Sequence, residues 1–174
     1  MNIVLSTLNA KYIHTSLALR YLKAYGERDF DMEIVEYTIK DPIMNIVSDL
    51  FNRKPDVIGF ACYIWNIEET LEVVRLLKKI LPDLTIVLGG PEVSYDTDYW
   101  MKSEPAVDFI VMGEGEATFH HLLQELQGDR KFHFVFGAAY RKPDGEVVIN
   151  PPRPKLDLNE IPSPYRFKED LPTL

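Results

Sequence analysis

Two apolar runs that end in glycine constrain the fold of this chain most. Residues 84–88 form one run and lead into Gly89 and Gly90, and residues 107–112 form another and lead into Gly113. Short runs rich in β-branched residues are typical of strands buried on both faces of a parallel sheet. Ligands of open α/β sheets bind beyond the carboxyl ends of the strands, where a glycine lets a ligand approach the backbone. We therefore expect the functional site at these strand ends.

Apolar runs of this kind alternate with helical patterns over the first 130 residues. Strands are expected at residues 3–8, 33–37, 56–61, 84–88 and 107–112. Helices are expected at residues 16–25, 42–51, 67–81, 96–103 and 116–126. Strand–helix units in this order predict a parallel sheet with right-handed crossovers and helices on both faces. We therefore expect a flavodoxin-like, doubly wound α/β fold with five parallel strands in the order 2-1-3-4-5.

Polar residues mark where several of these helices begin. Thr15 or Ser16 is expected to cap the first helix, and Asp41 the second. Asn66 stands three residues before Glu69, which is the spacing of a capping box. These signals place the loops before the helices, and therefore the loops at the carboxyl ends of the strands.

The pattern changes after residue 130. Residues 134–141 and 146–150 flank a Lys-Pro-Asp-Gly turn, which predicts a β-hairpin appended to the sheet domain. Five prolines within residues 151–164 are typical of a semi-rigid linker. We therefore expect a binding domain at residues 1–130, a hairpin at residues 131–150 and a proline-rich linker at residues 151–174.

Composition excludes several classes of partner and site. The net charge of −8 and the pI near 5.0 argue against a nucleic-acid partner, since a phosphate backbone needs a concentrated positive face. With one cysteine, Cys62, the chain can form neither an internal disulfide nor a cysteine metal cluster. Its start lacks a signal-peptide pattern, and no window approaches the roughly 18 apolar residues of a membrane span. We therefore expect a cytoplasmic protein without a membrane partner.

The loops after the first and third strands should flank a ligand, because the switch point of a 2-1-3-4-5 sheet lies between these strands. Residues 9–16 have neither the glycine spacing of a dinucleotide site nor that of a P-loop. Residues 62–66 are rich in aromatic side chains and would form an apolar wall. The loops therefore fit a broad planar ligand better than a small phosphate, with Gly89 and Gly90 letting it approach the fourth strand.

Four blocks of sequence carry a resemblance to a known family. Residues 9–19, 58–66, 88–92 and 111–116 are similar to the amino-terminal cobalamin-binding domain of B12-dependent radical S-adenosylmethionine proteins. The resemblance implies that the chain binds cobalamin. The residues that it implies at the cobalamin site are Asn9, Tyr12, His14, Thr15, Cys62, Tyr63, Trp65, Asn66, Gly89, Gly90, Pro91, Glu92, Gly113, Glu114 and Gly115.

The same resemblance implies a second domain. The proline-rich tail resembles the link that these proteins carry before a C-terminal radical domain, which binds S-adenosylmethionine and a [4Fe-4S] cluster. The C-x-x-x-C-x-x-C motif of that domain cannot be built from one cysteine. We therefore expect this chain to be the cobalamin-binding module of a longer enzyme, without a catalytic residue of its own. The parent would perform methyl transfer or other radical chemistry, on a substrate that this chain does not reveal.

The chain departs from the D-x-H-x-x-G pattern that follows the first strand in the methionine-synthase type of cobalamin domain. That pattern brings a histidine to cobalt. Here His14 stands five residues after Asn9, and no glycine follows at the spacing of the motif. We therefore expect cobalamin to bind base-off and without a histidine on cobalt, so that no side chain of this chain is a metal ligand.

Two other classes of function stay open on the residues alone. A flavin- or nucleotide-binding domain of the same topology could stack Tyr63 and Trp65 on an isoalloxazine, although the first loop lacks a phosphate cradle. A receiver-like interaction module would need acidic residues where this chain has Asn9 and Cys62. An acidic residue such as Glu114, beside the start of a helix, is favoured by the helix dipole without an acid–base role.

Overall fold

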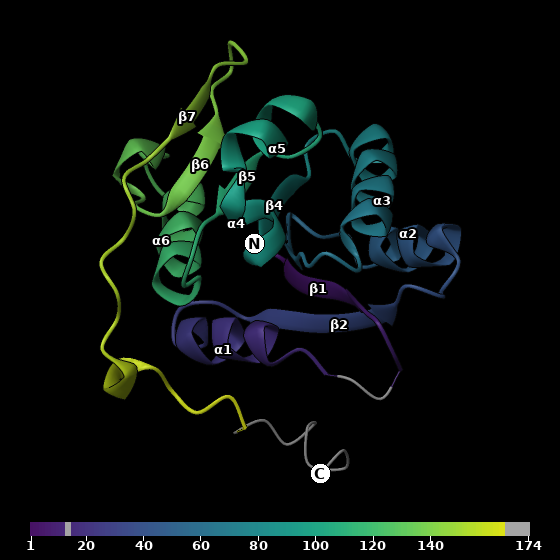
Figure 1. Ribbon diagram of the computed structural model, residues 1–174, viewed down its shortest axis with the longest axis horizontal. Helices are drawn as coiled ribbons and strands as arrows, with labels where there is room; N and C mark the ends of the chain where they lie inside the picture. The colour runs from purple at the N-terminus through teal and green to yellow at the C-terminus, as the bar shows by residue number, and fades with distance from the viewer. Residues whose placement is uncertain (13–14, 166–174) are drawn as a thin grey trace.

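The computed structural model describes residues 1–12 and 15–165, which fold around a seven-stranded sheet (Figure 1). The strands are β1 (Ile3–Asn9), β2 (Met32–Thr38), β3 (Val57–Ala61), β4 (Thr85–Gly89), β5 (Phe109–Val111), β6 (Ala138–Arg141) and β7 (Val147–Ile149). The helices are α1 (Leu17–Gly26), α2 (Ile43–Asn52), α3 (Ile67–Ile80), α4 (Pro91–Tyr95), α5 (Thr97–Ser103) and α6 (Glu116–Gln127). Short 3-10 turns occupy Phe132–Phe134 and Leu158–Glu160.

The first five strands are parallel and lie in the order β2-β1-β3-β4-β5, which confirms the predicted doubly wound α/β fold. The predicted hairpin continues the same sheet, with β6 antiparallel to β5 and β7 antiparallel to β6. Without β6, the backbone groups along one side of β5 would form an open sheet edge. The hairpin covers that edge, with Ala139 opposite Ile110. The sheet therefore has seven strands and is mixed, rather than five-stranded and parallel throughout.

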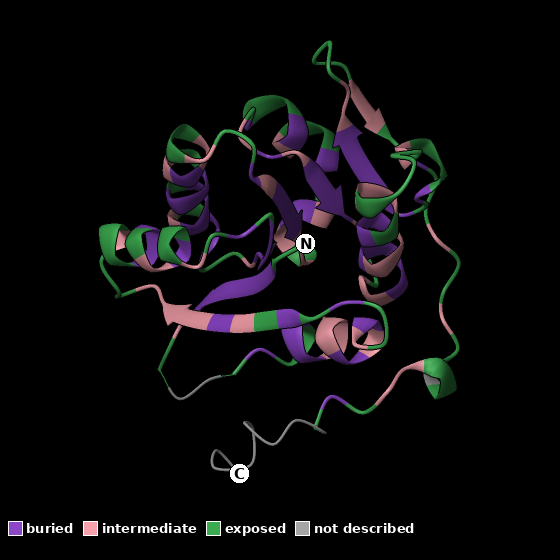
Figure 2. Cartoon of the chain, turned by 180° about the vertical axis from the view of Figure 1, so that it is seen from behind, coloured by how far each residue is buried: buried purple, intermediate pink, exposed green. Residues whose placement is uncertain are grey.

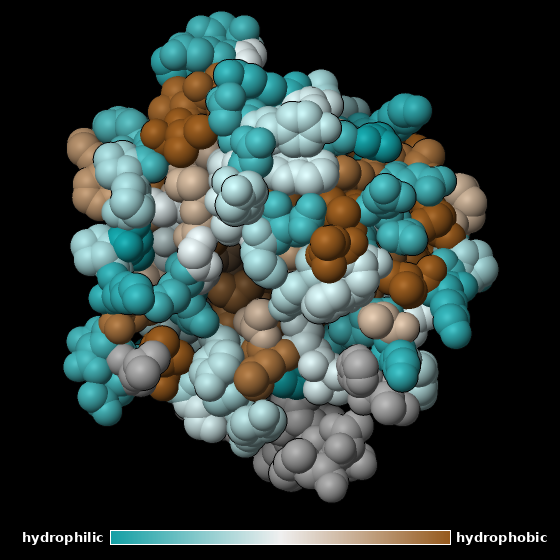
Figure 3. All heavy atoms as spheres, in the orientation of Figure 1, coloured by the Kyte–Doolittle hydropathy of each residue, from teal (hydrophilic) through white to brown (hydrophobic). Residues whose placement is uncertain are grey.

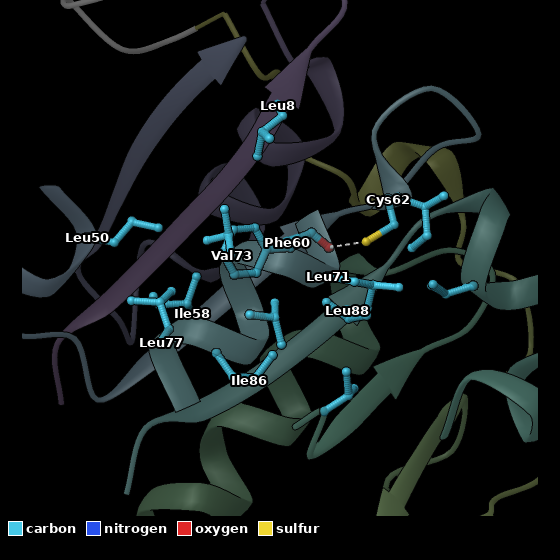
Figure 4. Packing of buried hydrophobic residues seen from close by; sticks show 14 of the residues in the cluster. Leu8, Leu50, Ile58, Phe60, Cys62, Leu71, Val73, Leu77, Ile86 and Leu88 are labelled. Carbon is cyan, nitrogen blue, oxygen red and sulfur yellow. Dashed lines mark hydrogen bonds between the residues drawn. The ribbon is translucent and has the colours of Figure 1, made fainter. Parts of the chain in front are cut away.

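Side chains along each strand alternate between two apolar layers. One layer, drawn in Figure 4, packs the sheet against α2, α3 and α5, and it includes Leu8, Leu50, Ile58, Phe60, Leu71, Leu77, Ile86, Leu88 and Met101. The other packs the sheet against α1 and α6, and it includes Ile3, Leu5, Leu19, Val57, Val87, Phe119 and Leu122. On β3, Val57, Gly59 and Ala61 face the layer of α1 and α6.

The starts of the helices confirm one predicted cap and correct two. The Ser16 hydroxyl caps α1 by accepting a hydrogen bond from the backbone N–H of Leu19. The predicted capping box at Asn66 is wrong, because this side chain is bonded to strand ends instead of α3. The Asp41 carboxylate accepts from the backbone N–H of Thr38 at 2.7 Å and so stabilises the turn after β2 rather than capping α2. None of the helices in the described ranges combines the length and the hydropathy needed to cross a bilayer.

The first residues of the proline-rich segment are held against α6. The backbone N–H of Gly137 donates to the Pro151 carbonyl at 2.8 Å. The Arg153 guanidinium donates to the Thr118 hydroxyl at 2.9 Å and to Nδ1 of His121 at 3.0 Å. Figure 2 shows the rest of the described tail as mostly exposed or half-buried chain along the outside of the molecule. The segment that we expected to be a linker therefore leaves the sheet domain from a fixed point on α6.

Candidate functional site

A cavity of about 420 Å³ opens at the carboxyl edge of the sheet, on the face that α1 and α6 cover. Figure 3 shows a hydrophobic hollow on this side of the molecule, among the segments that Figure 1 labels α1, α4 and α6. The floor comes from β3, β4 and β5, and the rim comes from the loops that follow these strands. The lining residues are Ala18, Leu19, Leu22, Gly59, Phe60, Ala61, Tyr63, Val87, Leu88, Gly89, Gly90, Pro91, Ser94, Val111, Gly113, Glu114, Gly115, Glu116 and Phe119.

The cavity exists because the strand residues under α1 and α6 are small toward the carboxyl ends. On β3 these positions are Val57, Gly59 and Ala61. The register of the sheet places Gly89 of β4 beside Ala61, and Val111 of β5 beside Gly89. Neither glycine carries a side chain, and Ala61 carries one methyl group. A space therefore remains between α1, α6 and this end of the sheet, which larger side chains on the strands would have filled.

Apolar side chains of α1 and α6 form the walls of the cavity. Leu19 and Leu22 come from α1, and Phe119 comes from α6. A Cβ atom at Gly115, just before α6, would lie 3.2 Å from a methyl carbon of Leu22, so the glycine lets the two helices approach closely at the rim. Leu19 and Phe119 are almost fully buried. The walls therefore offer hydrocarbon rather than hydrogen-bonding groups to whatever enters.

Gly90 shapes the rim for a reason that the sequence did not reveal. Its φ of 107° lies in the left-handed region, and a Cβ atom there would lie 2.4 Å from the Cys62 carbonyl oxygen. The backbone N–H of Cys62 also donates to the Gly89 carbonyl at 2.7 Å. The absent side chain of Gly90 therefore makes room for the backbone of the loop after β3. Our expectation that this glycine opens space for a ligand does not account for that contact.

Helix α4, which the sequence analysis did not predict, brings Ser94 to the rim. The Ser94 hydroxyl donates to the Gly90 carbonyl at 2.8 Å and accepts from the backbone N–H of Gly113 at 3.3 Å. This one side chain therefore ties together the turns after β4 and β5. Gly113 has a φ of 69°, and no described atom lies within 4 Å of the place where its Cβ atom would be. The rim is therefore open above Gly113.

Two stacked aromatic rings follow β3. Tyr63 lines the cavity, and its ring lies parallel to that of Trp65 with the centroids 4.5 Å apart and the planes 4° apart. Nearly half of the Trp65 surface is exposed. Burial raises the pKa of the Tyr63 hydroxyl above its ordinary value of 10.0, so this group is neutral at physiological pH. The pair presents a flat, uncharged surface beside the opening.

Cys62 and Asn66, two predicted site residues, are buried within the loop after β3. The Cys62 thiol lies in the layer under α2 and α3, with Sγ 3.8 Å from the Phe60 carbonyl oxygen (Figure 4). Burial raises the pKa of this thiol far above its ordinary range. The Asn66 amide donates to the carbonyls of Leu8 and Ala61, both at 3.1 Å. Asn66 therefore joins the ends of β1 and β3 at the switch point of the sheet.

The carboxyl end of β1 is tied to β2. The Asn9 amide donates to a Glu36 carboxylate oxygen at 3.1 Å, and the other oxygen of Glu36 pairs with Arg20 of α1 at 3.0 Å. Tyr12 is 91% exposed and Thr15 is exposed, and neither of them lines the cavity. His14 lies outside the described residues.

The predicted site residues thus fall into two groups in the described part of the chain. Those that line the cavity are Tyr63, Gly89, Gly90, Pro91, Gly113, Glu114 and Gly115. Those outside the lining are Asn9, Tyr12, Thr15, Cys62, Trp65, Asn66 and Glu92.

Sequence reasoning missed the walls and floor of the cavity and the bridge at Ser94. The wall and floor residues that it missed are Ala18, Leu19, Leu22, Gly59, Ala61, Val87, Val111 and Phe119. One signal in the sequence could have indicated the floor of the cavity. Gly59 and Ala61 are small residues at alternate positions of a buried strand and therefore lie on the same face. Among residues 1–12 and 15–165, no three His, Cys, Asp or Glu side chains are placed to hold a metal ion.

Comparisons with known proteins relate this geometry to a family. A model of the B12-binding domain matches residues 3–123. The chain is 29% identical to an uncharacterized methyltransferase of Pyrococcus horikoshii, over 85% of this chain and 32% of that protein. It is 30% identical to the cobalamin-dependent radical SAM methyltransferase TokK of Streptomyces tokunonensis, over 89% of this chain and 23% of that protein.

The fold is also similar to a solved structure. The cobalamin-dependent S-adenosylmethionine radical enzyme OxsB, with aqua-cobalamin and S-adenosylmethionine bound, superposes with a TM-score of 0.78 at 23% identity. The match covers 92% of this chain and 23% of that one. Across these three proteins, the chain spans between 23% and 32% of the length of the protein it matches.

Proposed function

This chain belongs to the B12-binding domain family, and from that premise we propose that it holds cobalamin base-off, with the nucleotide tail in the cavity between α1, α6 and the sheet. The observation that carries the proposal is the cavity itself, which is apolar inside and open at the carboxyl edge of the sheet. Its volume of about 420 Å³ lies within the usual range for small-molecule sites. The small residues of its floor, Gly59, Ala61 and Gly89, leave the room that a planar base needs.

The corrin ring would then lie across the rim, over the loops that follow the strands. Tyr63 and Trp65 supply a flat apolar surface there, and Gly113 leaves the backbone open to close approach. Of the other predicted residues, Asn9, Tyr12, Thr15, Glu92 and Glu114 lie at or after the carboxyl ends of β1, β4 and β5 and are proposed to contact the ring or its amide side chains. When bound, cobalamin would supply cobalt-centred chemistry, and the residues of this chain bind and orient it.

His14 is proposed not to coordinate cobalt, because it stands outside the D-x-H-x-x-G spacing. The buried residues Cys62 and Asn66 would support the site indirectly, since they hold the loop after β3 against β1 and β4. No side chain of this chain is assigned a catalytic role. The family match favours this function over the flavin- or nucleotide-binding and receiver-like alternatives.

The chain is proposed to be part of a longer protein. We propose that residues 1–130 form the binding domain, residues 131–150 the appended hairpin, and residues 151–174 a linker to a radical SAM domain. That domain would carry S-adenosylmethionine and a [4Fe-4S] cluster and would perform methyl transfer or other radical chemistry. The share of the relatives that this chain spans supports a further domain, and so do the relatives' own names. The contacts of Arg153 with α6 would then set the point from which that domain extends.

A binding experiment tests the cobalamin proposal. Hydroxocobalamin is mixed with the purified chain, and the complex is separated from free corrinoid by gel filtration. We expect corrin absorbance to follow the protein at close to one equivalent. Flavin mononucleotide serves as the matched ligand, because it is the occupant under the leading alternative. Co-elution of the flavin without corrinoid would reject the proposed function.

A further inference from the structure

We propose that the cavity selects among cobalamin-like cofactors by the base at the end of the nucleotide tail, accepting an apolar benzimidazole and excluding a purine. This inference rests on the proposed function, since it assumes that the tail enters the cavity. It adds a ligand class that the family match does not specify. Three features of the structure carry it: the chemistry of the floor, the pairing of the floor's backbone, and the position of the polar residues at the rim.

The deep lining is hydrocarbon. In the part of the chain that the structure describes, the residues around the inner end of the cavity are glycine or have aliphatic or aromatic side chains. They are Leu19, Gly59, Ala61, Val87, Val111 and Phe119. Most of them are nearly fully buried, with Val87 2% exposed and Phe119 3% exposed. A base at this depth therefore meets methyl groups and a ring, which suit a benzimidazole that carries methyl groups of its own.

The backbone of the floor is already paired within the sheet. Gly59 of β3 lies between Leu5 of β1 and Val87 of β4 in parallel register. The Ala61 carbonyl accepts from both the Thr7 hydroxyl at 3.0 Å and the Asn66 amide at 3.1 Å. Strand N–H and C=O groups also point along the sheet rather than out of it. The floor therefore has no polar group directed at a bound base in the described lining.

The polar lining residues Ser94, Glu114 and Glu116 lie at the rim, Glu116 as the first residue of α6, and Ser94 and Glu114 are engaged there. The Ser94 hydroxyl bridges Gly90 and Gly113, and the Glu114 carboxylate accepts from the backbone N–H of Leu156 at 3.2 Å. Glu114 and Ser94 belong to segments that follow β5 and β4, so they stand at the mouth of the cavity. A base held at the inner end would be separated from them by the tail itself.

Purine and benzimidazole differ in how many polar atoms they would bury here. An adenine base carries an exocyclic amino group and several ring nitrogens, whereas a dimethylbenzimidazole joined to its ribose keeps one free ring nitrogen. Each donor or acceptor that loses water without gaining a partner weakens binding by about tenfold or more. We therefore expect the adenine form to bind at least ten times more weakly than cobalamin.

Three corrinoids test this inference on the purified chain: cobalamin, the cobamide whose lower base is adenine, and cobinamide, which lacks the nucleotide tail. Dissociation constants are measured for each by absorbance titration. We expect cobalamin to bind tightest, and the adenine form to bind at least tenfold more weakly. A ratio below ten between these two would overturn the selectivity while leaving cobalamin binding intact. Failure of cobalamin itself to bind would instead reject the proposed function.

Cobinamide tests whether the nucleotide tail binds in the cavity at all, apart from which base the cavity prefers. If the cavity holds the tail, cobinamide should bind at least tenfold more weakly than cobalamin. Equal binding of cobinamide and cobalamin would show that the tail contributes nothing, and would overturn both the selectivity and the proposed place of the tail.

A pair of matched substitutions locates the selectivity in the cavity. Val87→Thr keeps the shape of a floor residue and adds one hydroxyl that can bond to a purine, so the ratio of the two dissociation constants should fall at least threefold. Val57→Thr makes the same change on the same face of the sheet, at a residue that is equally buried but outside the lining. The ratio should be unchanged in this control. An unchanged ratio in Val87→Thr, with the protein folded, would overturn the assignment to the floor.

Discussion

Gly89 and Gly90 are adjacent residues at the carboxyl end of β4. Replacing Gly89 should weaken cobalamin binding and leave the fold stable, whereas replacing Gly90 should destabilise the fold. A Cβ atom at Gly89 would lie 3.6 Å from the Val111 carbonyl oxygen and 3.9 Å from its Cβ atom, which are ordinary contacts. Gly89 also lines the cavity. Gly89→Val is therefore expected to leave the fold intact and to fill part of the space proposed for the nucleotide tail.

The size of the effect follows from packing. Forcing a ligand into an overfilled site costs about 1–3 kcal/mol, which corresponds to a loss of binding of roughly 5- to 150-fold. Gly89→Ala adds only one methyl group and should fall between the parent and the valine variant. The stability of both variants should stay within about 1 kcal/mol of the parent, because the added Cβ atom meets no close contact.

Replacing Gly90 should lower the stability of the fold. Its φ of 107° costs an L-residue about 1–2 kcal/mol, and the 2.4 Å approach to the Cys62 oxygen adds a backbone clash. Gly90→Ala should therefore lower the free energy of unfolding by more than about 2 kcal/mol. For a chain of this size each kcal/mol shifts Tm by about 2–4 °C, so Tm should fall by at least about 4 °C.

Thermal unfolding and cobalamin titration on the same preparations separate these effects. The expected pattern is a folded Gly89→Val that binds weakly and a destabilised Gly90→Ala. If Gly89→Val were as stable as the parent and bound cobalamin equally well, the tail would not lie against β4. If Gly90→Ala were as stable as the parent, the close approach of Cys62 would not be what requires glycine.

Two further predictions concern single side chains. His14→Ala should change cobalamin affinity by no more than a few fold. Electron paramagnetic resonance of the bound Co(II) form should show no splitting from an axial nitrogen in either protein. A nitrogen splitting that disappears in the variant would make His14 a ligand. Cys62 should resist alkylation at pH 8 in the folded chain and react on unfolding, because burial raises the pKa of its thiol above the ordinary value of 9.0. The same shift stabilises the fold fully below about pH 9, and this contribution is lost as the pH rises further, because the unfolded thiol then ionises while the buried one stays protonated. Equal alkylation of the folded and unfolded chain would contradict the burial of Cys62.

The sequence alone was enough to predict the order of the parallel strands, and it pointed to the sheet edge at which the structure has a cavity. Apolar residues repeat with short periods, and capping residues stand next to the helices that they begin. Strands β1 to β5 and most helices could therefore be recognised without knowing which other elements pack against them. The edge of the sheet that carries the site also followed from strand order, because parallel strands bring their carboxyl ends together. Ser16, the cap of α1, bonds to a residue three positions away and was one of the two caps predicted for the same reason.

What only the tertiary structure decided were the contacts between residues far apart in the chain. Gly90 must be glycine because of Cys62, Asn66 joins the end of β1 instead of capping α3, and Ser94 reaches across to Gly113. The floor of the cavity likewise depends on which residues of β3 and β4 lie side by side beneath α1 and α6. Periodicity in a sequence reports which residues share a face, whereas the space above that face depends on how closely other elements pack against it.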